Sequence, residues 1–159
     1  MDNLAFLAFI FMTDLHPLMT VIQVVPSIEA GMVGVATHEG RRSYQEDRYR
    51  VAQLRPDLLY LAVFDGHGGS LCAEYCEEHF ERHILHHMDR EEDMLVVLDK
   101  SFHDVNRSFE RWYTSKKKHL GRASSSGSTA TVGLLQDNYT LHLGHCGDSR
   151  AILCRCPQN

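Results

Sequence analysis

The seven residues 58–64, LLYLAVF, restrict the fold of this chain more than any other segment. They form a continuous apolar run, bounded by Pro56-Asp57 before it and by glycines after it, which is typical of a buried strand. The next residues, DGHGGS, include three glycines, which remove side-chain bulk and allow backbone conformations with positive φ. The segment therefore predicts a buried strand that ends in a sharp turn and presents Asp65 at the strand end.

Asp65 and His67 are candidate functional residues because this turn places a carboxylate and an imidazole beside exposed backbone carbonyls. A carboxylate fixed in this way suits a hard cation such as Mg²⁺ or Mn²⁺, which prefers oxygen ligands. His67 would supply a proton donor nearby. An ordinary strand-to-helix turn, with Asp65 or Ser70 as a helix cap, would explain the same residues without any chemistry.

Two amphipathic helices are predicted after the turn. The first runs from about Ser70 to His87, and the second starts near Glu91. Apolar residues recur on each helix at spacings of three and four, so the two should pack as an antiparallel pair. The apolar faces consist of Ala73, Cys76, Phe80 and Ile84 on the first helix and of Leu95, Leu98, Phe102, Val105, Phe109 and Trp112 on the second.

Segments with strand character lie on both sides of the helix pair. Residues 31–40 and 48–54 precede the buried strand, and TATVGLL, YTLHLGH and RAILCR follow residues 114–128, a basic, serine-rich segment predicted to be an exposed loop. Asp137-Asn138 is a predicted hairpin turn. This order favours an α+β fold, with antiparallel sheets covered by helices, over a doubly wound parallel sheet.

Composition limits the classes of protein that fit. A chain of 159 residues has room for one domain, and a net charge of −5 argues against nucleic acid or an anionic membrane as the main partner. Five cysteines without matched pairs favour a reduced chain. Residues 1–30 fit no signal peptide, transit peptide or membrane span, and we interpret them as an apolar, acid-containing leader of unknown role.

Three further clusters bear on the chemistry of Asp65. In GRRSYQEDR, residues 40–48, Arg42 can bind phosphate with two parallel hydrogen bonds and Glu46 with Asp47 can hold metal-bound water, although such a charged turn is more often a solvated loop. GHCGDSRA places Asp148 in a second glycine-bounded turn after a strand. SGSTATVGLL predicts a tightly packed strand and carries no chemistry of its own.

The motifs RRSYQED, VFDGHGG, SGSTATVGLL and GDSRAIL resemble, in order and approximate spacing, those of the metal-dependent protein phosphatase 2C (PPM-type) family. The resemblance runs from about Gly34 to Arg155 and is strongest to a mitochondrial branch that acts on the branched-chain oxoacid dehydrogenase complex. It implies the N-terminal portion of a four-layer α/β/β/α sandwich with mostly antiparallel sheets. It also implies hydrolysis of phosphoserine and phosphothreonine in proteins by a metal-activated water.

The resemblance assigns roles to seven residues. Arg42 would hold the substrate phosphate, His67 would protonate the leaving serine or threonine oxygen, and Glu46 with Asp47 would orient metal-bound waters. Two Mn²⁺ or Mg²⁺ ions, and a third at a weaker site, would be held by Asp47, Asp65, the Gly66 carbonyl and Asp148.

The family's later strands and metal-binding aspartates have no counterpart after Arg155 in this sequence. We therefore expect residues 31–159 to be a truncated phosphatase domain of marginal stability and little activity. The alternative is a non-catalytic fragment that binds phosphoproteins or other partners through Arg42 and the helix pair. Expected properties are a phosphorylated protein as substrate, no nucleic acid or membrane partner, a monomeric state, and a cytoplasmic or mitochondrial matrix location.

His79, His83 and His87 lie four residues apart on the first predicted helix, so three imidazoles could share one face and bind zinc. Neighbouring glutamates and the absence of these histidines from the apolar stripe favour a solvated surface instead. We expect the surface interpretation to hold.

Overall fold

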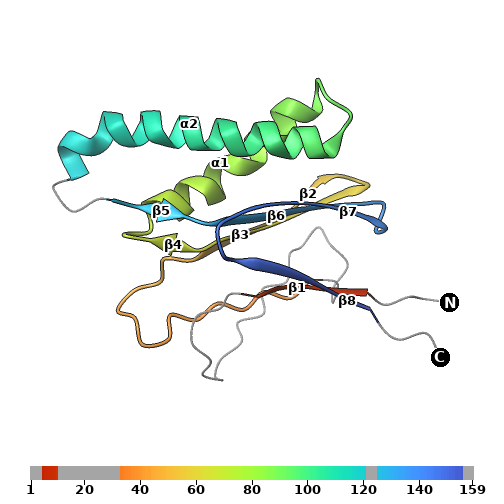
Figure 1. The fold of residues 1–159 in the computed structure, drawn as a ribbon, viewed down its shortest axis with the longest axis horizontal. Coiled ribbons are helices and arrows are strands. Elements are labelled where there is room, and N and C mark those ends of the chain that lie inside the picture. Colours follow the sequence, from red (N-terminus) through yellow and green to blue (C-terminus); the bar gives the residue numbers. More distant parts are fainter. Residues whose placement is uncertain (1–4, 11–32, 121–124, 156–159) are drawn as a thin grey trace.

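An antiparallel sheet of four strands carries two helices on one of its faces (Figure 1). The computed structural model describes residues 5–10, 33–120 and 125–155. The strand order in this sheet is β2-β3-β6-β7, while β1 pairs with β8 and β4 pairs with β5. The elements are β1 (Ala5–Ile10), β2 (Arg48–Arg55), β3 (Leu58–Phe64), β4 (Gly66–His67), α1 (Leu71–Met88), α2 (Met94–Leu120), β5 (Gly127–Ser128), β6 (Ala130–Gln136), β7 (Thr140–Cys146) and β8 (Arg150–Arg155). The predicted α+β class with antiparallel sheets is confirmed.

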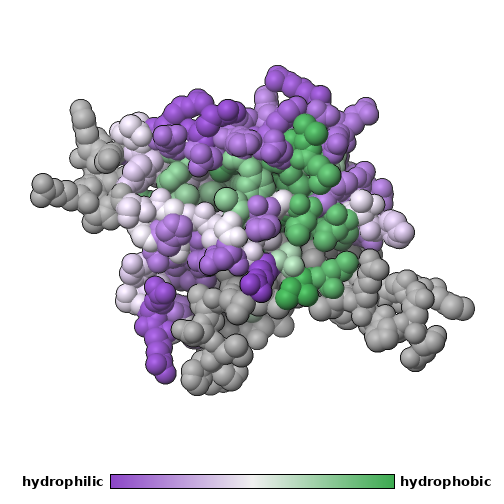
Figure 2. Space-filling model, viewed as in Figure 1, coloured by the Kyte–Doolittle hydropathy of each residue, from purple (hydrophilic) through white to green (hydrophobic). Residues whose placement is uncertain are grey.

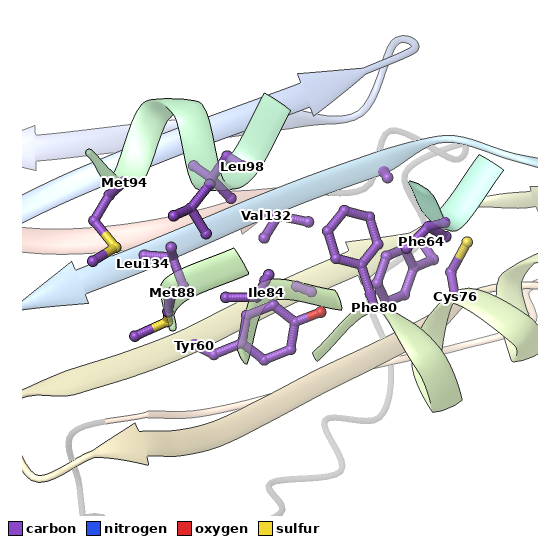
Figure 3. Close-up of a cluster of buried hydrophobic side chains, with 14 of the residues drawn as sticks. Tyr60, Phe64, Cys76, Phe80, Ile84, Met88, Met94, Leu98, Val132 and Leu134 are labelled. Carbon is purple, nitrogen blue, oxygen red and sulfur yellow. The ribbon is translucent and has the colours of Figure 1, made fainter. Parts of the chain in front are cut away.

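The core lies between the helix pair and the facing side of the sheet. Tyr60 of β3 and Val132 of β6 project from the sheet toward Phe80 and Ile84 of α1, and all four side chains are buried (Figure 3). The other side of β3 is also covered, since all seven of its residues are buried. Figure 1 shows the β1–β8 pair on the side of the sheet away from the helices. The buried strand predicted from residues 58–64 is therefore confirmed.

Both predicted helices are present, and the apolar stripe predicted for the second helix contains one wrong residue, Leu95. The first-helix stripe is buried as predicted, but Leu95 of the second stripe is 58% exposed. Because α2 begins at Met94, the inward positions of its first turns fall on Met94, Val97 and Leu98, which are buried. Leu95 then points about 100° away from Met94 around the helix axis.

The loop predicted at residues 114–128 is partly wrong. Helix α2 continues to Leu120, because lysine is a good helix former and three consecutive lysines do not end a helix. Ser126 and Ser128 are half-buried rather than exposed, since both side chains make hydrogen bonds to backbone groups of the turn after β3. This segment is part of the candidate site described below.

The strand predicted at residues 31–40 is not formed in its described part, residues 33–40. A strand needs a neighbouring strand to satisfy its backbone N–H and C=O groups. Among the described residues, β8 has β1 as its neighbour, and residues 33–40 pair with no strand. Residues 39–42 instead form a turn, in which Gly40 has φ +63° and the Arg42 N–H donates to the Glu39 carbonyl at 3.1 Å. Most of the predicted leader, residues 1–30, lies outside the described residues.

The hairpin turn between β6 and β7 is confirmed at Asp137-Asn138. Both residues have positive φ, +53° and +55°, and the Tyr139 N–H donates to the Gln136 carbonyl at 3.0 Å. Two positive φ values are the mark of the type I′ turn that matches strand twist. No helix in the described residues is both long enough and apolar enough to cross a membrane.

Candidate functional site

The turn after β3 is fixed by the segment that leads into β6. The Asp65 N–H donates to Thr129 Oγ1 at 3.2 Å, and the Asp65 carbonyl accepts the Thr129 N–H at 2.9 Å. In the short β4–β5 pair, Gly66 lies opposite Ser128 and His67 lies opposite Gly127. The predicted sharp turn is therefore held in place by residues more than 60 positions away in the sequence.

The SGST segment has a positioning role that sequence reasoning missed. Ser126 Oγ donates to the Gly69 carbonyl at 2.7 Å and accepts the Cys72 N–H at 2.9 Å, so it joins the glycine turn to the first turn of α1. Thr129 Oγ1 lies 2.6 Å from Ser149 Oγ, beside Asp148. The cluster of serine and threonine residues was the only sign of this role in the sequence. The hydrogen-bond partners of these residues depend on tertiary pairing, which the sequence pattern does not reveal.

Two glycines in this region are required by close packing. A Cβ atom added to Gly127 would lie 2.3 Å from His67 Nε2, so the imidazole ring lies against the Gly127 backbone. A Cβ atom added to Gly66 would lie 2.4 Å from the Glu46 carbonyl oxygen. The turn that carries Asp65 is thus packed directly against the turn that carries Glu46 and Asp47.

Asp47 and Asp65 form a hydrogen-bonded pair of carboxyl groups at the centre of the site. Burial, together with the negative charges of Asp65 and Glu46, raises the pKa of Asp47 from 3.8 to about 6. Burial and the charge of Asp148 also raise the pKa of Asp65. Burial is the largest cause of both shifts, and neighbouring carboxylates add to it: Asp65 and Glu46 at Asp47, and Asp148 at Asp65.

Arg48 anchors the turn that carries this acidic pair. Its guanidinium donates to the carbonyls of Gln45 and Asp47, at 2.9 and 2.8 Å, and pairs with Glu74 of α1. The Glu46 carboxylate, for its part, accepts the Gly69 N–H. Sequence reasoning did not single out Arg48, whose role depends on the position of α1.

The remaining predicted site residues lie around Asp65. The positive charges of His67 and Arg42 lower the pKa of Asp65, in opposition to the larger effects of burial and Asp148. Arg42 and Asp148 are exposed. One charged site is therefore formed by residues from three separate parts of the sequence, namely residues 42–47, residues 65–67 and Asp148.

The donor set fits part of a divalent cation site. Carboxylate oxygens are the ligands that Mg²⁺ and Mn²⁺ prefer, and a cation here would offset the negative charge that Asp65 and Glu46 bring to Asp47. Within the described residues, no three His, Cys, Asp or Glu side chains gather closely enough to hold a metal ion. The pair could thus supply two ligands, with further ligands still required.

The raised pKa of Asp47 predicts the pH dependence of metal-free stability. Between pH 3.8 and about 6 the folded chain binds more protons than the unfolded chain, so the free energy of unfolding falls as the pH rises through this window. We expect Asp47→Asn to be more stable than the parent by about 1 kcal/mol at pH 7.5, a modest value because solvent screens this half-buried group. The difference should vanish below pH 4.

Urea denaturation at several pH values, with a chelator present, measures this effect. Asp57→Asn, which changes an exposed aspartate in the turn between β2 and β3, is the matched control and should not alter the pH profile. An Asp47→Asn variant less stable than the parent at pH 7.5 would contradict the repulsion described here.

His79, His83 and His87 lie half-buried against neighbouring residues rather than on a fully solvated face, which corrects the expectation. His87 Nε2 lies 2.8 Å from Asp104 Oδ2, and His83 Nε2 lies 3.3 Å from Ser108 Oγ, both on α2. The His79 ring packs edge-on against the Tyr75 ring. Burial lowers the pKa of both His79 and His83.

Comparisons with known proteins agree on one family. A model of the family "Protein phosphatase 2C" matches residues 34–159. The chain is 43% identical over 136 residues to "Protein phosphatase 1K, mitochondrial" of Xenopus laevis, covering 84% of this chain and 35% of that protein. It is 33% identical over 134 residues to human "Protein phosphatase 1A", covering 77% and 34%.

Among solved structures, a serine-threonine phosphatase 2C from Toxoplasma gondii matches with a TM-score of 0.58 and 18% identity, over 74% of this chain and 46% of that chain. This likeness shows the fold. The chain spans about a third of the length of the two curated relatives.

Proposed function

Because the chain belongs to the protein phosphatase 2C family, we propose that it carries the N-terminal part of the active site of a metal-dependent protein serine/threonine phosphatase. The observation that supports this proposal is that the turn carrying Asp47 packs against the turn carrying Asp65, which brings the two carboxyl groups together. Members of the family depend on divalent metal ions in general. We assign Asp47, Asp65, the Gly66 carbonyl and Asp148 to binding two Mn²⁺ or Mg²⁺ ions, with a third at a weaker site.

The residues of this chain have distinct proposed tasks. Arg42 binds the phosphate through its guanidinium, which is well matched to phosphate oxygens. His67 donates a proton to the leaving serine or threonine oxygen, and Glu46 orients the attacking water while one of its oxygens accepts the Gly69 N–H. The cations supply positive charge against the phosphoryl oxygens and lower the pKa of the attacking water.

The proposed substrate class is a phosphoserine- or phosphothreonine-containing protein. The name of the Xenopus relative makes the mitochondrion the first compartment to test; we propose the mitochondrial matrix, with the cytoplasm as the alternative. We further propose that the chain is monomeric and binds neither nucleic acid nor membrane.

A non-catalytic role is the second candidate. It is favoured by the lack of a complete metal-ligand set in the described residues. In that case Arg42 and the helix pair would bind phosphoproteins without turnover.

Hydrolysis of a small aryl phosphate and of a phosphothreonine peptide, with Mn²⁺ and with chelator, separates the two candidates. The phosphatase proposal expects turnover that requires Mn²⁺. Peptide binding without turnover, at any Mn²⁺ concentration that occupies the site in calorimetry, would support the non-catalytic role and overturn the first proposal.

For Arg42→Ala, in a chain that spans the whole phosphatase domain, we expect mainly a higher KM for the phosphorylated peptide, by about tenfold or more, with a smaller change in kcat. The guanidinium binds phosphate without making or breaking bonds, so its loss weakens the bound ground state and transition state alike. Steady-state kinetics on the peptide measure both constants. Arg41→Ala, which removes the adjacent exposed arginine, is the control, and a pure loss of kcat in Arg42→Ala would contradict the assigned role.

A further inference from the structure

Cys72 and Cys76 lie on successive turns at the start of α1, and both line one cavity of about 600 Å³ between α1, α2 and β7. Cys72 is half-buried, and Cys76 is buried, with 7% of its surface exposed. The two cysteines are four residues apart on this helix, so their side chains lie on the same face. The lining of the cavity includes two exposed leucines, Leu95 and Leu143. Figure 2 shows apolar surface below the hydrophilic residues that cover the helices.

We propose that Cys72 and Cys76 are an oxidation-sensitive dithiol, in which a peroxide oxidises Cys72 and Cys76 then closes a disulfide with it. This is a modification site separate from the proposed metal ligands. The reagent class is hydrogen peroxide or another small hydroperoxide that enters the cavity.

The environments of the two thiols differ in the way that such chemistry needs. Cys72 is half-buried and lines the cavity, so a small peroxide can reach its sulfur, whereas burial limits access to Cys76 and raises its pKa. The thiolate is the nucleophile in cysteine chemistry. Cys72 is thus suited to react first, while Cys76 keeps its proton and lies within reach as the second thiol.

The reaction balances with peroxide as the only oxidant. The Cys72 thiolate attacks one oxygen, the O–O bond breaks, and a sulfenic acid forms while hydroxide leaves. The Cys76 sulfur then attacks the Cys72 sulfur, the S–O bond breaks, and the hydroxyl group leaves as water with the Cys76 proton. In total the two thiols lose two electrons, and one peroxide is reduced to two water molecules once the first hydroxide is protonated.

Closing this disulfide would strain the first turn of α1. Residues four apart on a helix have Cβ atoms about 5–6 Å apart, whereas a disulfide needs about 3.5–4.5 Å. The Cys72 N–H donates to Ser126 Oγ, which in turn donates to the Gly69 carbonyl. Movement of Cys72 would therefore disturb the glycine turn, and a resulting loss of phosphatase activity rests on the proposed function.

Peptide mapping tests the thiol chemistry without any activity assay. The chain is treated with hydrogen peroxide, free thiols are blocked with N-ethylmaleimide, and the protein is cleaved after glutamates. Because Glu74 lies between the two cysteines, cleavage places them on separate peptides, which stay joined only through a disulfide. We expect a joined pair that reduction separates, and in Cys76→Ser a sulfenic acid at Cys72 that dimedone traps.

Cys146 is the internal control, since it is an exposed thiol lining the same cavity. Cys146→Ser should leave the joined pair unchanged, and Cys72 should be oxidised several-fold faster than Cys146. Separate peptides after peroxide treatment, or oxidation of Cys146 ahead of Cys72, would overturn the proposal. A joined pair in a protein that shows no phosphatase activity in either redox state would support the dithiol and count against the proposed function alone.

Discussion

In a chain that spans the whole phosphatase domain, the Asp65→Asn substitution should lower metal-dependent phosphatase activity by on the order of a hundredfold or more. The substitution keeps the shape of the side chain and its place at the end of β3 but removes the negative charge that Asp65 would bring to the cations. Mn²⁺ binding, measured by calorimetry, should weaken in the same variant. The readouts are Mn²⁺ affinity and turnover of a phosphothreonine peptide.

Loss of folding would not explain this result. Removing one of two mutually repelling carboxylates lowers the repulsion that raises the pKa of Asp47, so the metal-free variant should be at least as stable as the parent. Asp89→Asn, at the exposed C-terminal end of α1, is a control that should leave both readouts unchanged. Parent-like Mn²⁺ affinity and turnover in Asp65→Asn would refute the assignment of Asp65.

The Gly66→Ala variant should be destabilised by about 2–4 kcal/mol, a large effect for one methyl group. The new Cβ atom would lie 2.4 Å from the carbonyl oxygen of Glu46 and 3.2 Å from Cβ of Ala73. The first contact is with backbone, which cannot rotate away as a side-chain end can, so the turns at residues 45–47 and 65–69 must separate. Urea denaturation measures the loss.

Gly34→Ala provides the matched control for this substitution. Its Cβ atom would meet nothing within 4 Å, so we expect a change of less than about 0.5 kcal/mol. Equal stabilities of Gly66→Ala and Gly34→Ala would show that the two turns are not packed together as described.

Local patterns were sufficient to predict most regular elements. The apolar run of β3, the three-and-four spacing on α1 and the Asp137-Asn138 turn each depend on neighbouring residues, and the structure confirms all three. The end of α2 was misjudged because a lysine-rich, serine-rich segment is typical of loops, although lysine itself permits a helix. Residues 33–40, the described part of the strand predicted at residues 31–40, do not form a strand, because strand formation depends on a partner that local sequence does not specify.

The site was only partly predictable for the same reason. Charged residues in glycine-bounded turns, such as Asp65 and Asp148, stand out in the sequence. Ser126, Thr129 and Arg48 do not, because each acts through a group more than 20 residues away. The contacts of such positioning residues follow from tertiary pairing, which spacing within one segment cannot reveal.

The bonds between the Asp65 turn and residues 126–129 also bear on the order of folding. The Asp65–Thr129 contact joins residues 64 positions apart, and the Gly69–Ser126 contact joins residues 57 positions apart, with the whole helix hairpin in between. Closing so long a loop is slow relative to forming the local α1–α2 hairpin. We therefore expect the hairpin to form early and the acidic site late, so that in refolding experiments Mn²⁺ affinity would appear only after helical circular dichroism has recovered.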